Sequence, residues 1–334
     1  MFIKKDLRKI PRILADAAPI DEQQENIEEN SAKRVKRDVL TELKLARRKS
    51  EFKGSLRVIC QPSNAPSLQH LVNLSVYDCD IKSLEGIGLL GSSVDATVQG
   101  QSRSVCCPSL ESLNVGRNPI TNLPDELSML SKSLKELWCD DCQIQGPLPR
   151  CVLMLEKLET LHMANNQITE LPSEISMLQY LKHLCLDRNN LDAIPEQLAS
   201  LQNLEVVLLR HNRITFLPDL PSNIKLLHVS SNLLESLPPS LTQRVGLEQL
   251  FANGNVLKSI PFGLETLPNL KRLNLSNNKI EFVPVAFTTR FGEPDRTTGL
   301  CENDKECIVY VGQNDFLMEE KTTSPAKKNA IMAA

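Results

Sequence analysis

The feature that most constrains the fold is a segment of apolar residues that recurs along most of the chain. One copy, "LETLHMANNQITELPSEISML", places apolar residues at Leu158, Leu161 and Met163 and an asparagine at Asn166. The pattern opens nine times, mostly at intervals of 23 or 24 residues, at Leu71, Leu110, Leu134, Leu158, Leu181, Leu204, Ile224, Leu247 and Leu270. One copy is too short to bury its own leucines, so neighbouring copies are expected to stack and share a continuous core.

The pattern L-x-x-L-x-L-x-x-N/C-x-L resembles the leucine-rich repeat, and the resemblance covers residues 71 to about 290. Apolar residues at the fourth and sixth positions of each copy predict a short strand with one buried face. The polar residue at the ninth position predicts a turn in which its side chain hydrogen-bonds buried backbone groups. The resemblance implies an α/β solenoid, a horseshoe with a parallel β-sheet on its concave face.

The two ends of such a stack need covers, because a terminal repeat would otherwise expose its core. Residues 31–53 are predicted to form an N-terminal helical cap, since apolar residues recur there at helical spacing. These apolar residues are Val35, Val39, Leu43 and Ala46. The segment 54–59 is predicted to be a strand or half-repeat, and 306–317 is predicted to add a last strand.

The predicted organisation therefore has five parts along the chain. They are a partly disordered segment at 1–30, a cap and half-repeat at 31–66, a repeat domain at 67–290, a cap at 291–317 and a disordered tail at 318–334. An insertion at 91–109, "GSSVDATVQGQSRSVCCPS", interrupts the repeats after the first copy. It is expected to be a tolerated surface loop, with a partner-contacting arm as the alternative.

The composition limits the classes of function. The formal net charge of −3 argues against a general affinity for nucleic acid. No stretch reaches the roughly 18 apolar residues needed to span a bilayer, and "MFIKKDLRKIPRIL" lacks the apolar run of a secretory signal. A cytoplasmic location is therefore expected, with the nucleus as an alternative. The chain has no glycine-rich phosphate loop, G-x-S-x-G or H-E-x-x-H motif, so no catalytic residue, cofactor or small-molecule substrate is expected.

The stretch "WCDDC" contains a C-x-x-C pair, Cys139 and Cys142, that raises the question of a metal or redox site. The repeat pattern assigns Cys139 to the sixth position, a buried leucine slot, and Cys142 to the ninth, where the consensus allows cysteine. A zinc knuckle needs a second ligand pair nearby, and none occurs at suitable spacing. The structural interpretation is therefore favoured over a metal or redox role, and no metal is expected.

The exposed strand positions predict a binding surface. Side chains at the fifth position alternate with buried leucines, so they are expected to point into the concavity. The central members are Trp138, His162, Cys185, Leu208, His228 and Phe251. A mixed-charge rim flanks this stripe and comprises Asp140, Asp141, Asp187, Arg188, Arg210 and His211. An apolar centre with a polar rim is typical of a protein-binding patch, although the stripe could also pack only on itself.

A second column of residues, at the second repeat position, alternates in charge without a break from Glu111 to Lys271. Adjacent strands lie about 4.8 Å apart, so each charge is expected to have opposite charges on both sides. This column is predicted to be a solvated ladder of ion pairs.

The L-P-x-x-L style of the repeats is similar to that of intracellular leucine-rich repeat proteins, namely the Ras-group-related proteins of plants and protists and the Shoc-type scaffolds of Ras signalling. The resemblance implies a non-enzymatic scaffold or adaptor, with small GTPase or phosphatase signalling components as possible partners. Two alternatives stay open: a regulatory or substrate-receptor subunit of a larger enzyme complex, and a nuclear RNA-associated repeat protein.

Overall fold

The computed structural model describes residues 40–47, 52, 54–60, 64, 68, 70–90, 109–295, 297–301 and 307–315. The expectations for the N-terminal segment, for nearly all of the 91–109 insertion and for the C-terminal tail lie outside these residues. The chain divides into two compact units, which are described separately below. Unit 1 comprises Met1–Ile168 and Met177–Leu181, and unit 2 comprises Thr169–Ser176 and Lys182–Ala334.

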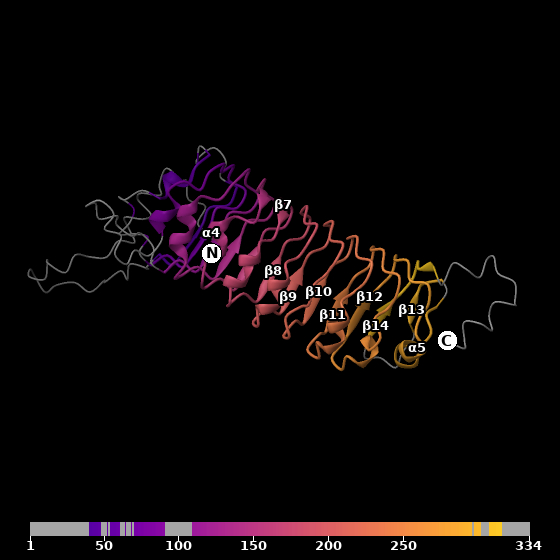
Figure 1. Ribbon diagram of the computed structural model, residues 1–334. Helices are drawn as coiled ribbons and strands as arrows, with labels where there is room; N and C mark the ends of the chain where they lie inside the picture. The colour runs from indigo at the N-terminus through magenta and orange to yellow at the C-terminus, as the bar shows by residue number, and fades with distance from the viewer. Residues whose placement is uncertain are drawn as a thin grey trace, which may run out of the picture. The chain divides into compact units, whose positions relative to one another are not determined.

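Unit 1 is built on a parallel sheet whose strands follow one another in chain order (Figure 1). The strands are β1 (Glu42–Lys44), β2 (Asn73–Ser75), β3 (Ser112–Asn114), β4 (Glu136–Trp138) and β6 (Thr160–His162). The leucine at the centre of each strand is paired in register with the leucine of the next, and all of these leucines are buried. One face of the sheet is therefore the core, and the other is called the open face below.

Short helical turns return the chain between the strands of unit 1. They are η3 (Leu56–Val58), η5 (Ile87–Leu90), η6 (Asp125–Leu130) and α4 (Arg150–Leu153), and β5 (Gln145–Pro147) forms at the "QIQGPLP" turn. Both η6 and α4 begin directly after a proline in extended conformation, Pro124 and Pro149. Proline fixes its own φ and has no N–H to leave unpaired, so it suits the entry to such a turn. Strand β7 (Gln167–Glu170) and η7 (Ser173–Met177) lie at the boundary between the two units.

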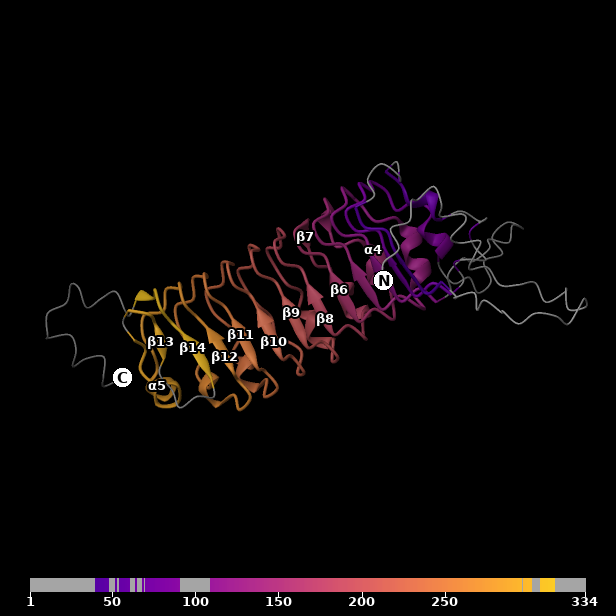
Figure 2. The same cartoon turned by 180° about the vertical axis from the view of Figure 1, so that it is seen from behind.

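Unit 2 repeats this arrangement, as Figures 1 and 2 show from opposite sides. Its parallel strands are β8 (His183–Cys185), β9 (Val206–Leu208), β10 (Leu226–His228), β11 (Gln249–Phe251), β12 (Arg272–Asn274) and β14 (Ile308–Tyr310). Strand β13 (Leu300–Cys301) runs antiparallel to β14 at the end of the sheet. The return segments contain η8 (Glu196–Ser200), η9 (Pro239–Gln243), η10 (Leu264–Thr266) and α5 (Val285–Phe291). Among the described residues, no helix has the length and apolar character needed to cross a membrane.

The asparagine at the ninth repeat position joins each repeat to the one before it. The Asn212 side chain donates to the carbonyls of Leu186, at 2.9 Å, and Leu209, at 3.0 Å, and accepts from the Leu191 N–H at 3.0 Å. Asn232 does the same one repeat later. These bonds satisfy backbone groups that no strand reaches, as the sequence predicted, and the same network recurs at Asn118, Asn166, Asn255, Asn278 and Asn314.

The predicted N-terminal cap helix is wrong for its described part, since Glu42–Lys44 form β1. Leu43 and Leu45 are buried on the core side, whereas Glu42 and Lys44 are exposed. The reason is that L-x-x-L-x-L is present from Leu40 to Leu45, so this segment is one more repeat opening, and its alternation outweighs the apolar helical spacing. Residues 31–39 lie outside the described part of the chain.

Of the two alternatives predicted for the segment 54–59, a strand or a half-repeat, the strand is wrong, because the segment contains the helical turn η3. Ser55 accepts a hydrogen bond from the Arg57 N–H at 3.2 Å at the start of η3. Within this segment, strand-like pairing is limited to an isolated bridge between Ser55 and Ser83. The predicted last strand is confirmed as β14. There, Val309 is buried, and Asn314 donates to the Leu275 carbonyl at 3.0 Å.

Candidate functional site

In unit 1 the open face carries an aromatic pair at the fifth repeat position. Trp138 of β4 and His162 of β6 are register partners, and each follows a buried leucine in its strand. Their rings stack with centroids 3.9 Å apart and an interplanar angle of 29°. Both side chains are half-buried, so part of the only tryptophan in the chain remains open to solvent. The alternation in sequence thus placed Trp138 and His162 correctly on this face.

In unit 2 the same position forms an apolar stripe of Leu208, His228 and Phe251. The three residues are register partners across β9, β10 and β11. The His228 and Phe251 rings are tilted at 43°, with centroids 4.9 Å apart, and all three side chains are half-buried. The stripe therefore packs partly on itself and still presents apolar surface to solvent.

Burial lowers the pKa of His228, with smaller effects from charged neighbours. Asp187 acts in the opposite direction and raises this pKa, while Arg210 and His211 lower it further. A histidine with a lowered pKa is neutral at neutral pH. His228 consequently belongs to the apolar stripe under these conditions and adds no charge to it.

The expected exposure of Cys185 is wrong, because this side chain is only 5% exposed. Cys185 lies in register beside Leu208, whose side chain is longer. A short thiol next to a larger neighbour is covered even on the open face. At this point of the sheet, Leu208 is the residue that a partner would touch.

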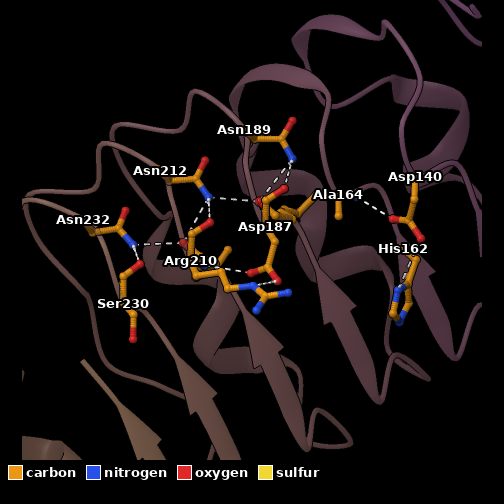
Figure 3. A network of polar contacts seen from close by, with 11 residues as sticks. Asp140, His162, Ala164, Asp187, Asn189, Arg210, Asn212, Ser230 and Asn232 are labelled. Carbon is orange, nitrogen blue, oxygen red and sulfur yellow. Dashed lines mark hydrogen bonds and ion pairs between the residues drawn. The ribbon is translucent and has the colours of Figure 1, made fainter. Parts of the chain in front are cut away.

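Two aspartates that follow β4 are held by the next repeat. Asp140 accepts a hydrogen bond from the Ala164 N–H at 2.6 Å, and its other carboxylate oxygen lies 3.7 Å from His162 Nδ1 (Figure 3). Asp141 accepts from the Asn165 side chain at 2.6 Å and lies 3.6 Å from Arg117 Nε. Asp140 thereby helps to orient His162, and with it the stacked Trp138.

In unit 2 the corresponding aspartate is Asp187, which is 2% exposed. Its two carboxylate oxygens accept from the Arg210 backbone N–H at 2.8 Å and from Arg210 Nε at 2.6 Å (Figure 3). The Arg210 side chain itself is 46% exposed. Asp187 is therefore a buried group that positions Arg210. The sequence offers a signal for this role, since Asp140 and Asp187 both occupy the seventh repeat position.

The other predicted rim residues occupy the eighth repeat position, where the backbone is left-handed. The residue before the ninth position has left-handed φ in repeat after repeat, including Asp141 at 54°, Arg188 at 53° and His211 at 56°. A non-glycine residue rarely adopts this conformation, and here each of the three residues donates its backbone N–H to a carbonyl of the next repeat. Arg188 is exposed in this turn.

The ladder of alternating charges at the second position is confirmed for three described pairs. The lysine Nζ and glutamate carboxylate are 2.9 Å apart in Lys135–Glu111, 2.8 Å in Lys225–Glu205 and 2.7 Å in Lys271–Glu248. These charges already have partners inside the chain. They are therefore poor candidates for recognising a charged ligand.

The C-x-x-C cysteines occupy structural positions, as predicted. Cys139 is fully buried, and Cys142 donates weakly to the Val115 carbonyl at 3.6 Å, in the place of a ninth-position asparagine. Burial raises the pKa of Cys139 well above its usual range and that of Cys142 to about 11. Both thiols therefore stay protonated at neutral pH. The described residues contain no group of His, Cys, Asp and Glu side chains that could hold a metal ion. That the protein binds no zinc stays a prediction.

Two family models match parts of the chain. The model described as "Leucine rich repeat" matches residues 156–214, and the one described as "Leucine Rich repeats (2 copies)" matches residues 245–285. Neither describes a catalytic family. The search of curated protein sequences found no significant match.

Solved structures with the same repeat architecture resemble the chain. The leucine-rich repeat protein LIC12759 of Leptospira interrogans is 25% identical with a TM-score of 0.54, over 76% of this chain and 63% of that one. The plant peptide hormone receptor RGFR1, solved in complex with RGF2, is 27% identical with a TM-score of 0.51, over 64% of this chain and 37% of the receptor. The ectodomain of the receptor kinase GASSHO1/SCHENGEN3 of Arabidopsis thaliana is 21% identical with a TM-score of 0.55, over 76% of this chain and 31% of that one. At this identity the similarity shows the fold alone. The chain thus spans less than two thirds of the length of each of these proteins, and the predicted leucine-rich repeat fold is confirmed.

Proposed function

We propose that this leucine-rich repeat chain is a non-enzymatic adaptor that holds protein partners together through the open faces of its sheets. Leucine-rich repeats are protein–protein interaction modules, and the plant receptor that resembles this chain was solved with RGF2 bound. We place the adaptor in intracellular signalling, in the cytoplasm, on the basis of the repeat style. Small GTPase and phosphatase components are the first partners to test.

The observation that carries this proposal is the line of aromatic and apolar side chains at the fifth repeat position. Such side chains are costly to leave in water, and they are only half-buried in each unit. Around them, Asp140 and Arg210 are fixed by hydrogen bonds to neighbouring repeats. An apolar centre inside a polar rim of fixed geometry suits the capture of another protein.

The energy of such an interface should concentrate in its aromatic anchors. Trp138 anchors the open face of unit 1, and Phe251 anchors that of unit 2. We expect Trp138→Ala or Phe251→Ala to cost about 2 kcal/mol or more in affinity, roughly thirtyfold. The fold should be retained, because both side chains point away from the leucine core.

The test is affinity purification from native cells with the wild-type chain and these two variants, read by quantitative mass spectrometry. Lys135→Ala is the matched control, because Lys135 lies directly before β4 and pairs with Glu111 on the ladder. Circular dichroism of each variant checks the fold. A partner retained by both aromatic variants and lost when residues 91–109 are replaced would move the binding site to the insertion. A stoichiometric catalytic partner would favour a regulatory subunit of an enzyme complex.

A further inference from the structure

Three exposed arginines of unit 2 lie in the loops that follow two successive strands, and they are called the basic cluster below. Arg188 follows β8, and Arg210 and Arg213 follow β9. The Arg188 N–H donates to the Arg210 carbonyl at 2.8 Å, so the two turns lie against each other. The cluster therefore has a defined backbone arrangement.

Two of the three arginines of the basic cluster, Arg188 and Arg213, have no ion pair in the described part of the chain, and the third, Arg210, is paired with Asp187 through Nε. Arg210 is held only through Nε and its backbone N–H, which leaves the terminal guanidinium nitrogens available. By contrast, Lys225 and Lys271 each pair with a glutamate within 3 Å. Asp192 is an exposed carboxylate on the same loop edge, and it forms no ion pair with the cluster.

The buried Asp187 makes Arg210 a preorganised donor. One of its oxygens accepts from the Arg210 backbone N–H and the other from Arg210 Nε, which anchors the guanidinium at its Nε edge. Arginine binds carboxylates most strongly when it offers two parallel N–H groups in a fixed plane. The remaining donors of Arg210 can therefore recognise a carboxylate at a small entropic cost.

The apolar stripe begins beside the cluster. Leu208 stands two residues before Arg210 on β9, and His228 and Phe251 continue the stripe across β10 and β11. The charges of Arg210 and His211 act on the pKa of His228, so these groups lie within electrostatic reach of one another. A ligand seated on the stripe would thus extend directly onto the cluster.

The cluster ends abruptly along the sheet. At the seventh and eighth positions, the next two repeats carry only uncharged residues, Ser230 and Ser231 followed by Asn253 and Gly254. A nucleic acid strand would need a longer row of cations to follow its phosphates, and the chain as a whole is negative at −3. A short group of carboxylates matches the cluster better.

Resting on the proposed function, we propose that unit 2 binds a short acidic segment of a protein partner. Carboxylates of that segment bind the basic cluster of Arg188, Arg210 and Arg213, and an adjoining apolar side chain of the same segment packs on Leu208 and Phe251. The cluster selects the partner by its charge, and the stripe supplies most of the contact area.

The test begins with a random peptide library displayed on phage and selected on the full chain. The selected sequences should be rich in Asp or Glu next to Leu or an aromatic residue. A synthetic peptide from this selection is then titrated by fluorescence anisotropy against the wild type, Arg188→Gln and Arg213→Gln. Each variant should lose about tenfold in affinity, and the wild-type affinity should fall with rising salt.

Lys225→Gln is the matched control, because it removes one positive charge that already pairs with Glu205 in the same unit. It should leave the affinity for the peptide unchanged. Arg210→Lys keeps the charge and removes the guanidinium anchored by Asp187, and it should weaken binding as the glutamine variants do.

Several results would overturn the inference. They are a selection that yields no peptide or no enrichment of acidic residues, equal affinity of the arginine variants and the wild type, or single-stranded RNA binding with the same arginine dependence. If the affinity of the selected peptides falls in Phe251→Ala but not in the arginine variants, the partner segment is not acidic. The proposed adaptor function would be unaffected by that result. Cellular partners that survive both Trp138→Ala and Phe251→Ala would instead remove the proposed binding through the open faces, on which this inference rests.

Discussion

Asn212 illustrates how one side chain can hold two repeats together. Its amide bonds the carbonyls of Leu186 and Leu209 and the N–H of Leu191, and all of these groups are buried. Asn212→Leu keeps a similar volume and leaves the buried Leu191 N–H without an acceptor, while the Leu186 and Leu209 carbonyls each lose one of their two asparagine donors. One unsatisfied buried group costs roughly 1–3 kcal/mol and each of the two other lost hydrogen bonds about 1 kcal/mol, so the variant should lose on the order of 3 kcal/mol of folding free energy.

Denaturant unfolding followed by circular dichroism measures this loss. Asn223→Ala is the control, because Asn223 is exposed and donates only to the Gln202 carbonyl, at 2.6 Å. It should change stability by less than about 1 kcal/mol. Equal midpoints for the two variants would show that the ninth-position amide is dispensable.

His228 should make the stability of the protein sensitive to acid. Burial lowers its pKa in the folded state, so between that pKa and about 6.5 the unfolded chain binds more protons than the folded chain. Stability is therefore unaffected by His228 above about pH 6.5 and declines as the pH falls below that value. His228→Gln removes the titrating group, so its melting temperature should decline less between pH 7 and pH 5.

Melting curves of the wild type and His228→Gln across this range provide the measurement. The charged or titratable neighbours Asp187, Arg210 and His211 remain in both proteins, so the difference between the two curves isolates His228. Parallel pH profiles would mean that His228 titrates no differently in the folded and unfolded states.

At the residue scale, alternation along a strand was sufficient to predict which side chains leave the core. Trp138 and Phe251 lie on the open face for this reason. Alternation could not predict that Cys185 is covered or that Asp187 is buried. Both outcomes depend on what the adjacent repeat offers, a longer Leu208 side chain in one case and the Arg210 donors in the other.

At the scale of elements, β1 shows how an apolar pattern can fit two periods at once. Leu43 fits both a helical spacing with Val39 and a strand alternation with Leu45. The predicted helix is wrong here, because Glu42–Lys44 form a strand. The strand prevails because it pairs with β2 in register, Leu43 beside Leu74, and buries both leucines. The sequence of this short segment alone cannot show which structure forms, because the strand that pairs with it lies 31 residues further along the chain.

Leu43→Ala tests whether β1 closes the core of unit 1. The leucine is 6% exposed, and its truncation leaves a cavity against the next repeat. A loss of about 2–4 kcal/mol in folding free energy is expected from guanidinium unfolding. Lys44→Ala, on the exposed face of the same strand, should change stability by no more than about 0.5 kcal/mol. If the two variants unfold alike, β1 is not part of the folded core.

On the scale of the whole molecule, the repeat architecture makes stability local. In unit 2, each strand of the parallel sheet hydrogen-bonds its immediate neighbours, and each ninth-position asparagine reaches back by one repeat. In such a chain the stability approximates a sum of repeat terms and nearest-neighbour terms. Damage at one edge of unit 2 should therefore fade within a few strands.

Gly299→Ala tests this locality at the C-terminal edge of unit 2. Gly299 has φ +68°, and a Cβ there would lie 2.1 Å from the Gly312 Cα, a contact that cannot be accommodated without moving the backbone. The substitution should break the hydrogen bond from Val311 N–H to the Gly299 carbonyl and detach β13 from β14. Hydrogen exchange should accelerate strongly in β13 and β14, less in β12, and not at all in β8 and β9. Gly246→Ala is the control, because a Cβ there meets only the Ile224 carbonyl, at 3.8 Å, and exchange should be unchanged throughout. Uniform acceleration from β8 to β14 in Gly299→Ala would show instead that unit 2 unfolds as one cooperative block, with coupling between repeats too strong for local opening.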